Sequence, residues 1–187
     1  MKQTKKSGSA ILIDCVNWVT FLVAIGCFVL YYGGIVRSGV VLWVGVTSFT
    51  ILYHLGLRIF MGTVTSRWRL RYTHPWFRER FFERKLYKLL RVRRWKEKVL
   101  TYDPASFSVQ DHTLEEIANT MTKSETDHWI NQLISLSTLL FAIPWGVFWI
   151  FFVTAILAML FDAQFIIVQR YNRPIVLRLM ARGRQRV

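Results

Sequence analysis

A glutamate and a histidine three residues apart carry the clearest chemical signal in this sequence. Glu125 and His128 stand in the run ETDHW, and on a helix this spacing places both side chains on one face. A carboxylate beside an imidazole is suited to orient the ring for proton abstraction. The same Glu-x-x-His spacing is half of a di-iron carboxylate site, but it occurs once, which disfavours a metal. A surface histidine that caps an interfacial helix is the other explanation.

Two arginines near the C-terminus form a second cluster. Arg170 and Arg173 lie in the run QRYNRP, together with Gln169, Tyr171 and Asn172. Two guanidinium groups this close can bind a phosphate or a carboxylate. A stop-transfer cluster that contacts lipid headgroups is the alternative.

Three more polar residues stand inside otherwise apolar segments. His54 and Arg58 are four residues apart and therefore share one helix face, while Asp162 follows much later in the chain. Asp162 can pair with Arg58 or orient His54 if the three lie at similar depth. The alternative is that Arg58 extends to the headgroups and Asp162 bonds to a neighbouring helix.

The composition indicates that these residues are positioned in a membrane. The chain has 187 residues, is 53% hydrophobic and 16% aromatic, and carries a net charge of +14. Its uninterrupted apolar runs are longer than a soluble core helix needs. With a bilayer as the solvent, the basic excess favours anionic lipid over nucleic acid as a partner.

The apolar runs predict an all-α, multi-pass membrane protein with about four transmembrane helices. They are expected at residues 11–32, 40–61, 129–143 and 146–168, and together they make one membrane domain over residues 1–187. The last two share an apolar run too long for one span. We expect the sequence IPWG, from Ile143 to Gly146, to break this run at a tight turn.

The distribution of basic residues predicts the orientation. Residues 62–128 carry fourteen Lys and Arg, against one in the first turn and none around Pro144. The positive-inside rule therefore places this segment, both termini and the basic tail 169–187 in the cytosol. The polar residues of the spans then gather in the cytosolic half.

The basic segment contains a run with helical spacing, WFRERFFERKLYKLLRVRRWKEKVL, at residues 76–100. Aromatic and aliphatic residues recur between cations, which predicts an amphipathic helix on the membrane surface that ends at residues 102–104. The alternative is a solvated helix packed on its own domain. Another short helix is expected from Leu114 to Met121.

Three stretches together resemble the glycosyl-4,4'-diaponeurosporenoate acyltransferase family of small bacterial membrane proteins. They are VRRWKEKVL (92–100), KSETDHWI (123–130) and FIIVQRYNRPIVLRL (165–179), and the last is the most specific. The resemblance covers roughly residues 76–182 and implies transfer of a fatty acyl group to a sugar hydroxyl of a glycolipid in the cell membrane, such as a glycosylated carotenoid. It also implies a thioester co-substrate, acyl-coenzyme A or acyl carrier protein, with no tightly bound cofactor.

A mechanism follows from the resemblance as a hypothesis. His128, oriented by Glu125, is expected to remove the proton of the attacking hydroxyl, and Arg170, Arg173 and Asn172 to hold the donor's phosphates or stabilise the oxyanion. The same site is expected to include Gln169, Tyr171, His54, Arg58 and Asp162.

Other classes of function stay open on the sequence alone. A non-enzymatic scaffold or a lipid-handling protein needs only basic amphipathic segments and a polar cluster at the inner leaflet. Another lipid-modifying enzyme would require a nucleotide cofactor, for which the sequence has no Gly-x-Gly-x-x-Gly motif. Four small helices also leave a homo-oligomer open.

Overall fold

All regular elements of the described chain are helices. The structure, a computed structural model, describes residues 8–99 and 104–184, and no strand occurs in them. Three helices are long and apolar enough to cross a membrane, at Ile11–Tyr32, Gly39–Thr65 and Phe148–Gly183. The all-α prediction is confirmed, whereas the expected count of four spans is not. The chain forms two units, Met1–Met61 and Gly62–Val187.

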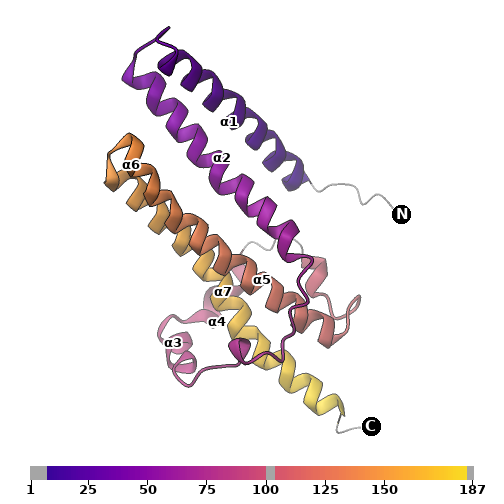
Figure 1. The fold of residues 1–187 in the computed structure, drawn as a ribbon. Coiled ribbons are helices and arrows are strands. Elements are labelled where there is room, and N and C mark those ends of the chain that lie inside the picture. Colours follow the sequence, from indigo (N-terminus) through magenta and orange to yellow (C-terminus); the bar gives the residue numbers. More distant parts are fainter. Residues whose placement is uncertain (1–7, 100–103, 185–187) are drawn as a thin grey trace, which may run out of the picture. The chain divides into compact units, whose positions relative to one another are not determined.

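The first unit is a hairpin of two apolar helices. α1 spans Gly8–Tyr32, and α2 begins at Gly39 and ends at Thr65, within the second unit. The two helices run antiparallel (Figure 1). A Cβ on Gly45 would stand 2.9 Å from the Cβ of Cys27, so the glycine permits this close approach. Trp18 and Leu22 are exposed on the outer face, as lipid-facing residues would be.

A second and longer hairpin dominates the second unit. α5 (Leu114–Ser137) continues through η4 (Thr138–Phe141) and α6 (Ala142–Trp145) to a turn, and α7 (Phe148–Arg184) runs back beside α5 (Figure 1). Gly146 and Val147 both have positive φ, 70° and 49°. The predicted break at residues 143–146 is confirmed, because a left-handed glycine ends the helix there.

α5 begins at a capping box and continues without interruption. The Thr113 side chain accepts a hydrogen bond from the Glu116 backbone N–H, and the Glu116 carboxylate accepts one from the Thr113 backbone. The prediction of a separate short helix from Leu114 to Met121 is wrong. No proline or glycine follows Met121 within α5, so that helix and the expected third span are one element.

α7 also extends beyond its expected end. It has 37 residues, so the helix continues through the basic sequence that was expected to follow the fourth span at residue 168. Pro174 lies inside it, where it removes one backbone donor. The continuation brings Arg170 and Arg173 onto the same rigid helix as Asp162.

The basic segment at residues 76–100 is not one helix, and that prediction is wrong. Its described part contains η1 (Pro75–Phe77), α3 (Glu83–Leu89), α4 (Val92–Trp95) and η2 (Lys96–Lys98), and η3 (Pro104–Phe107) follows. Arg91, between α3 and α4, has a left-handed backbone with φ 50°, which interrupts the helical path. The predicted end at residues 102–104 falls mostly outside the described residues.

Residues of this segment divide between core and surface. Phe77, Tyr87 and Val92 are buried, whereas Phe81 and Leu89 are 93% and 79% exposed. The segment is therefore packed on its own unit through one set of side chains and presents another set outward.

Candidate active site

The facing sides of α5 and α7 hold most of the buried polar groups. On α7, Asp162, Ile166, Gln169 and Arg173 recur every three or four residues and are all buried. This spacing puts them in one row along the helix, toward α5. The sequence thus builds a row of buried polar groups along the interface between these two helices.

His128 is paired across this interface with Asp162. Its Nδ1 lies 2.9 Å from Asp162 Oδ1, and the Asn131 amide donates to the same oxygen at 3.3 Å. Asp162 is 1% exposed, and the His128 side chain is 20% exposed. An ionised Asp162 accepts the Nδ1 proton, so a neutral His128 carries its lone pair on Nε2.

A stacked aromatic ring holds the imidazole from the side. The rings of His128 and Phe165 are parallel within 3°, with centroids 4.5 Å apart. Phe165 and Asp162 lie nearly one turn apart on α7, so the same helix fixes the ring's plane and its hydrogen bond. Such a pair supplies an oriented base, the function that the sequence assigned to Glu125 and His128.

Glu125 has other partners. One of its oxygens accepts from Arg170 Nη1 and the other from Arg173 Nη2, both at 2.6 Å, and Glu125 is fully buried. Its remaining hydrogen bond, at 3.4 Å, comes from Trp129 Nε1. The expectation that Glu125 orients His128 is therefore corrected. Two buried guanidinium groups bind the two oxygens of the Glu125 carboxylate, and Asp162 is the hydrogen-bond partner of the His128 Nδ1.

Arg170 links Glu125 to a second buried carboxylate. Its Nε and Nη2 donate to Glu83 Oε1 at 2.9 and 2.6 Å, and Tyr87 donates to Glu83 Oε2 at 2.8 Å. We call Glu83, Glu125, Arg170 and Arg173 the charge network. Burial and the hydrogen bond to Glu83 raise the pKa of Tyr87 above its ordinary range, so the phenol stays a donor.

Arg173 lies deepest in the charge network. It is 1% exposed, donates to the carbonyls of Phe77 and Met121, and stacks over the Phe77 ring at 5.1 Å. Arg170 is slightly more exposed and also donates to the carbonyls of Trp76 and Arg78. Both arginines are thus engaged in joining α5, α7 and residues 76–83.

The other predicted site residues are distributed around this core. Gln169 donates to Ser124 at 3.4 Å, and Asn172 accepts from Lys96 at 2.9 Å. Tyr171 packs edge-on against Tyr87 and under the Lys96 ammonium. His54 and Arg58 lie on α2 within the first unit, so their predicted pairing with Asp162 stays a prediction.

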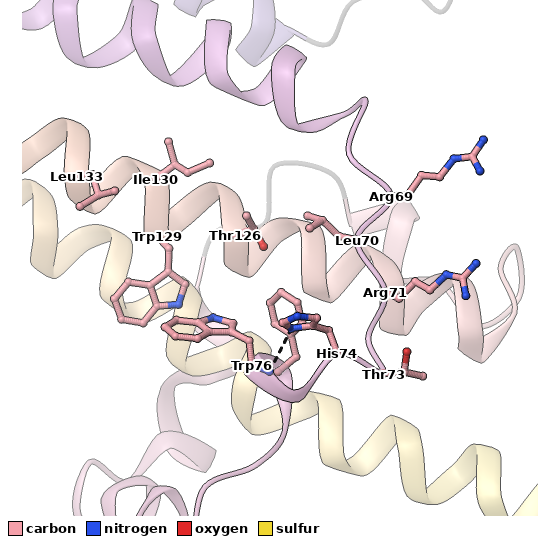
Figure 2. Close-up of a pocket in the computed structure, with 11 residues that line it drawn as sticks. Arg69, Leu70, Arg71, Thr73, His74, Trp76, Thr126, Trp129, Ile130 and Leu133 are labelled. Carbon is pink, nitrogen blue, oxygen red and sulfur yellow. Dashed lines mark hydrogen bonds between the residues drawn. The ribbon is translucent and has the colours of Figure 1, made fainter.

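An apolar pocket of about 510 Å³ opens on another side of α5 (Figure 2). We call it the aromatic pocket. Trp76 and Trp129 meet edge to face beside His74, while the side chains of Arg69 and Arg71 point away. The other lining residues are Leu70, Thr73, Phe77, Thr126, Ile130 and Leu133.

Sequence reasoning missed several of these residues. His74, Trp76, Trp129 and Glu83 were assigned no role, because Trp76 and Trp129 are far apart in the sequence and only the fold brings them together. His74 Nδ1 accepts from the Trp76 backbone at 3.2 Å, so its Nε2 carries the proton when the ring is neutral. In residues 8–99 and 104–184, no group of three or more His, Cys, Asp or Glu is placed to hold a metal.

The helices and the composition define a helical membrane protein in which a histidine pairs with a buried carboxylate. A model of the glycosyl-4,4'-diaponeurosporenoate acyltransferase family matches residues 73–182, more than half of the chain. The chain belongs to this family, and it is an acyltransferase of the kind that acts on carotenoid glycosides. No curated protein and no solved structure matches it.

Proposed function

We propose that the enzyme transfers a fatty acyl group from a thioester donor to a sugar hydroxyl of a carotenoid glycoside, with His128 as the general base. The observation that supports this most is the pairing of His128 with the buried Asp162, which leaves Nε2 to act on a substrate. In this proposal Asp162 is the positioning residue. Glu125, Arg170 and Arg173 hold the helices that carry the pair.

The proposed step balances without any further reactant. Nε2 takes the hydroxyl proton as the oxygen attacks the thioester carbonyl, and a C–O bond forms. The tetrahedral intermediate then breaks its C–S bond, and the imidazolium returns the proton to the leaving thiolate. The products are the ester and a free thiol.

The aromatic pocket is suited to an apolar chain of one substrate. Its tryptophans offer flat apolar surface, and the neighbouring Ile130 and Leu133 extend this surface along α5. An Ile130→Trp substitution should fill the pocket, so KM for the carotenoid glycoside should rise with little change in kcat. Leu136→Trp, on an exposed position of the same helix outside the pocket, is the matched control.

The base is tested by acyl transfer with purified protein and labelled acyl-coenzyme A. Removing a general base costs about 10²- to 10⁴-fold in rate, so His128→Ala should lose that much, and added imidazole should restore part of it. Asp162→Asn keeps the shape of the side chain but favours the wrong tautomer, and should lower kcat. A folded His128→Ala enzyme with normal turnover would exclude this base.

The control uses a second histidine–carboxylate pair, which lies on the surface. His112 and Glu116 are 3.8 Å apart and both exposed, on consecutive turns around the start of α5. His112→Ala removes the same chemical group and should leave the rate unchanged. Circular dichroism and gel filtration in detergent should show the same helical content and size for all variants.

The topology that we propose places the active site at the inner face of the bacterial cell membrane. The stretch from Trp129 to Trp145 has 17 residues, about 25 Å of helix, and would enter the bilayer as the first arm of the second hairpin. The basic segment and both termini would then be cytosolic, beside anionic lipid. Cysteine labelling at positions 37 and 147, against positions 85 and 182, tests this orientation.

A further inference from the structure

Arg170 and Arg173, which the sequence predicted to bind the donor's phosphates, are already occupied within the charge network. Arg170 and Arg173 are almost fully buried, and each already binds at least one carboxylate at 2.6 Å. A phosphate would have to displace Glu125 from both arginines, which would leave that carboxylate buried without a partner. Another set of cations must bind the donor if the donor is phosphorylated.

Such a set lines a separate hollow of about 630 Å³, which we call the cationic pocket. Lys88 comes from α3, Arg91 from the turn, and Arg93 and Arg94 from α4. All four are exposed, and none has an acidic partner among the residues that the structure describes. Four uncompensated positive charges around one hollow are a strong attraction for an anion.

The remaining polar residues of the cationic pocket are already engaged. Arg84 binds Glu79 through two hydrogen bonds at 2.9 and 3.0 Å, and Arg178 donates to the Pro174 carbonyl. The hydrogen bond from Arg84 keeps the pKa of Glu79 below its ordinary range, so this lone acid is charged and matched. It does not neutralise Lys88, Arg91, Arg93 and Arg94.

A strained backbone residue helps to build the cationic pocket. Arg91 has φ 50° and ψ 40°, a left-handed conformation that favours glycine. This residue separates α3 from α4, and Lys88 from the one helix lines the same hollow as Arg93 and Arg94 from the other, while Val92 between them is buried. An arginine at this position costs backbone energy, as residues at binding sites often do.

We infer that the cationic pocket binds the phosphates of coenzyme A in the acyl donor, an inference that rests on the proposed function. Coenzyme A carries a diphosphate and a separate phosphomonoester, which can engage several guanidinium groups at once. The phosphate of a single lipid headgroup would leave most of the four cations unmatched. Tyr171, Pro174 and Ile175 give the hollow an apolar wall against which an adenine can pack.

The test uses full-length protein in a neutral detergent and measures the Kd of coenzyme A by calorimetry. Arg91→Gly removes a guanidinium and suits the left-handed backbone, and Arg94→Gln is added to it. Each lost charge-assisted hydrogen bond should weaken binding about 10-fold or more, and KM for acyl-coenzyme A should rise with kcat unchanged. Lys85→Gln, on α3 but outside the pocket, is the matched control and should keep the wild-type Kd.

Ligand variants separate the sources of phosphate. Dephospho-coenzyme A should bind to the wild type more weakly than coenzyme A does. If the pocket binds the phosphomonoester, the double variant should bind both ligands with the same, weaker affinity. An unchanged Kd and KM in the double variant would overturn the inference and leave the proposed function intact. The inference would also be overturned if the double variant lost binding only to phosphatidylglycerol vesicles or to acyl carrier protein. Tight binding of coenzyme A without any acyl transfer would instead contradict the proposed function and support the coenzyme A site.

Discussion

Two groups of arginines, one on α7 and one beside it, differ in burial and in their partners. Arg170 and Arg173 are buried on the side of the helix near α5, and carboxylates and carbonyls surround them. Arg91, Arg93 and Arg94 are exposed beside α7, and no acid among the described residues pairs with them. The same side chain therefore stabilises the protein in one place and is available to a ligand in the other.

The difference follows from what each environment demands of a charge. A buried guanidinium must be compensated by the protein itself, because water cannot reach it. An exposed one is solvated and can exchange water for an incoming anion at low cost. Changes in the charge network should consequently lower stability, whereas changes in the cationic pocket should lower affinity for a donor.

The largest effect is expected for Glu125→Gln. The change removes the carboxylate charge that pairs with Arg173 and one of the two that pair with Arg170, and it preserves the side chain's size. Losing one partner of a buried pair costs about 3–5 kcal/mol. Thermal unfolding in detergent should show a clear drop. Arg91→Gly, from the other group, should hardly move the midpoint.

A double replacement sharpens this result. Glu125→Leu combined with Arg173→Leu removes a buried pair instead of half of it, and should recover much of the lost stability. Failure of Glu125→Gln to destabilise the protein at all would mean that water reaches the network, and the contrast between the two arginine groups would then fail.

A smaller effect is expected for Glu83→Gln. Arg170 would keep Glu125 and two carbonyls as partners, and its side chain is 11% exposed, so the uncompensated charge is less severe. We expect a loss of about 2 kcal/mol, near that of a hydrogen bond to a charged group. The same unfolding assay measures it, and a loss equal to that of Glu125→Gln would show that both carboxylates are equally essential.

The sequence was sufficient to predict the break near Gly146 and to select His128 as a candidate base, but it did not pair His128 with Asp162. The spacing of Glu125 and His128 is a local rule, and it says nothing of residues from another helix. In a helical hairpin, residues at equal distances along the chain from the turn lie opposite each other. His128 lies 18 residues before Gly146, which places it opposite residue 164, between Asp162 and Phe165.

The basic segment shows a different limit. Its alternation of cations and aromatic residues fits a helix. The residue types around Arg91 do not indicate the left-handed backbone that interrupts this helix. Glycine is the residue that signals such a conformation. The exposure of Phe81 and the burial of Phe77 likewise depend on packing against α7, which periodicity does not report.

A still smaller effect is expected for Tyr87→Phe, which removes the neutral donor to Glu83. The net loss of one hydrogen bond is about 1 kcal/mol. The pKa of Tyr87 is raised in the folded state, so its contribution is present below the unfolded pKa of about 10 and is lost as the pH rises above it. Unfolding midpoints from pH 7 to 11 should fall for the wild type more than for Tyr87→Phe, and parallel curves would count against the buried phenol.

The smallest effect is expected for Arg84→Gln, at the rim of the cationic pocket. Its ion pair with Glu79 is largely exposed on the arginine side, 75%, so solvent and salt screen it and the unfolding midpoint should barely change. The pKa of Glu79 is lowered by this pair, and any contribution is therefore present above the ordinary glutamate pKa of about 4.3 and disappears as the pH falls further. Midpoints of the wild type and Arg84→Gln, compared at pH 7 in low and high salt, measure it. A large loss of stability that persists in high salt would show that Arg84 behaves like the buried arginines. The distinction between arginines that stabilise the fold and arginines that are available to a ligand, on which the donor site depends, would then fail.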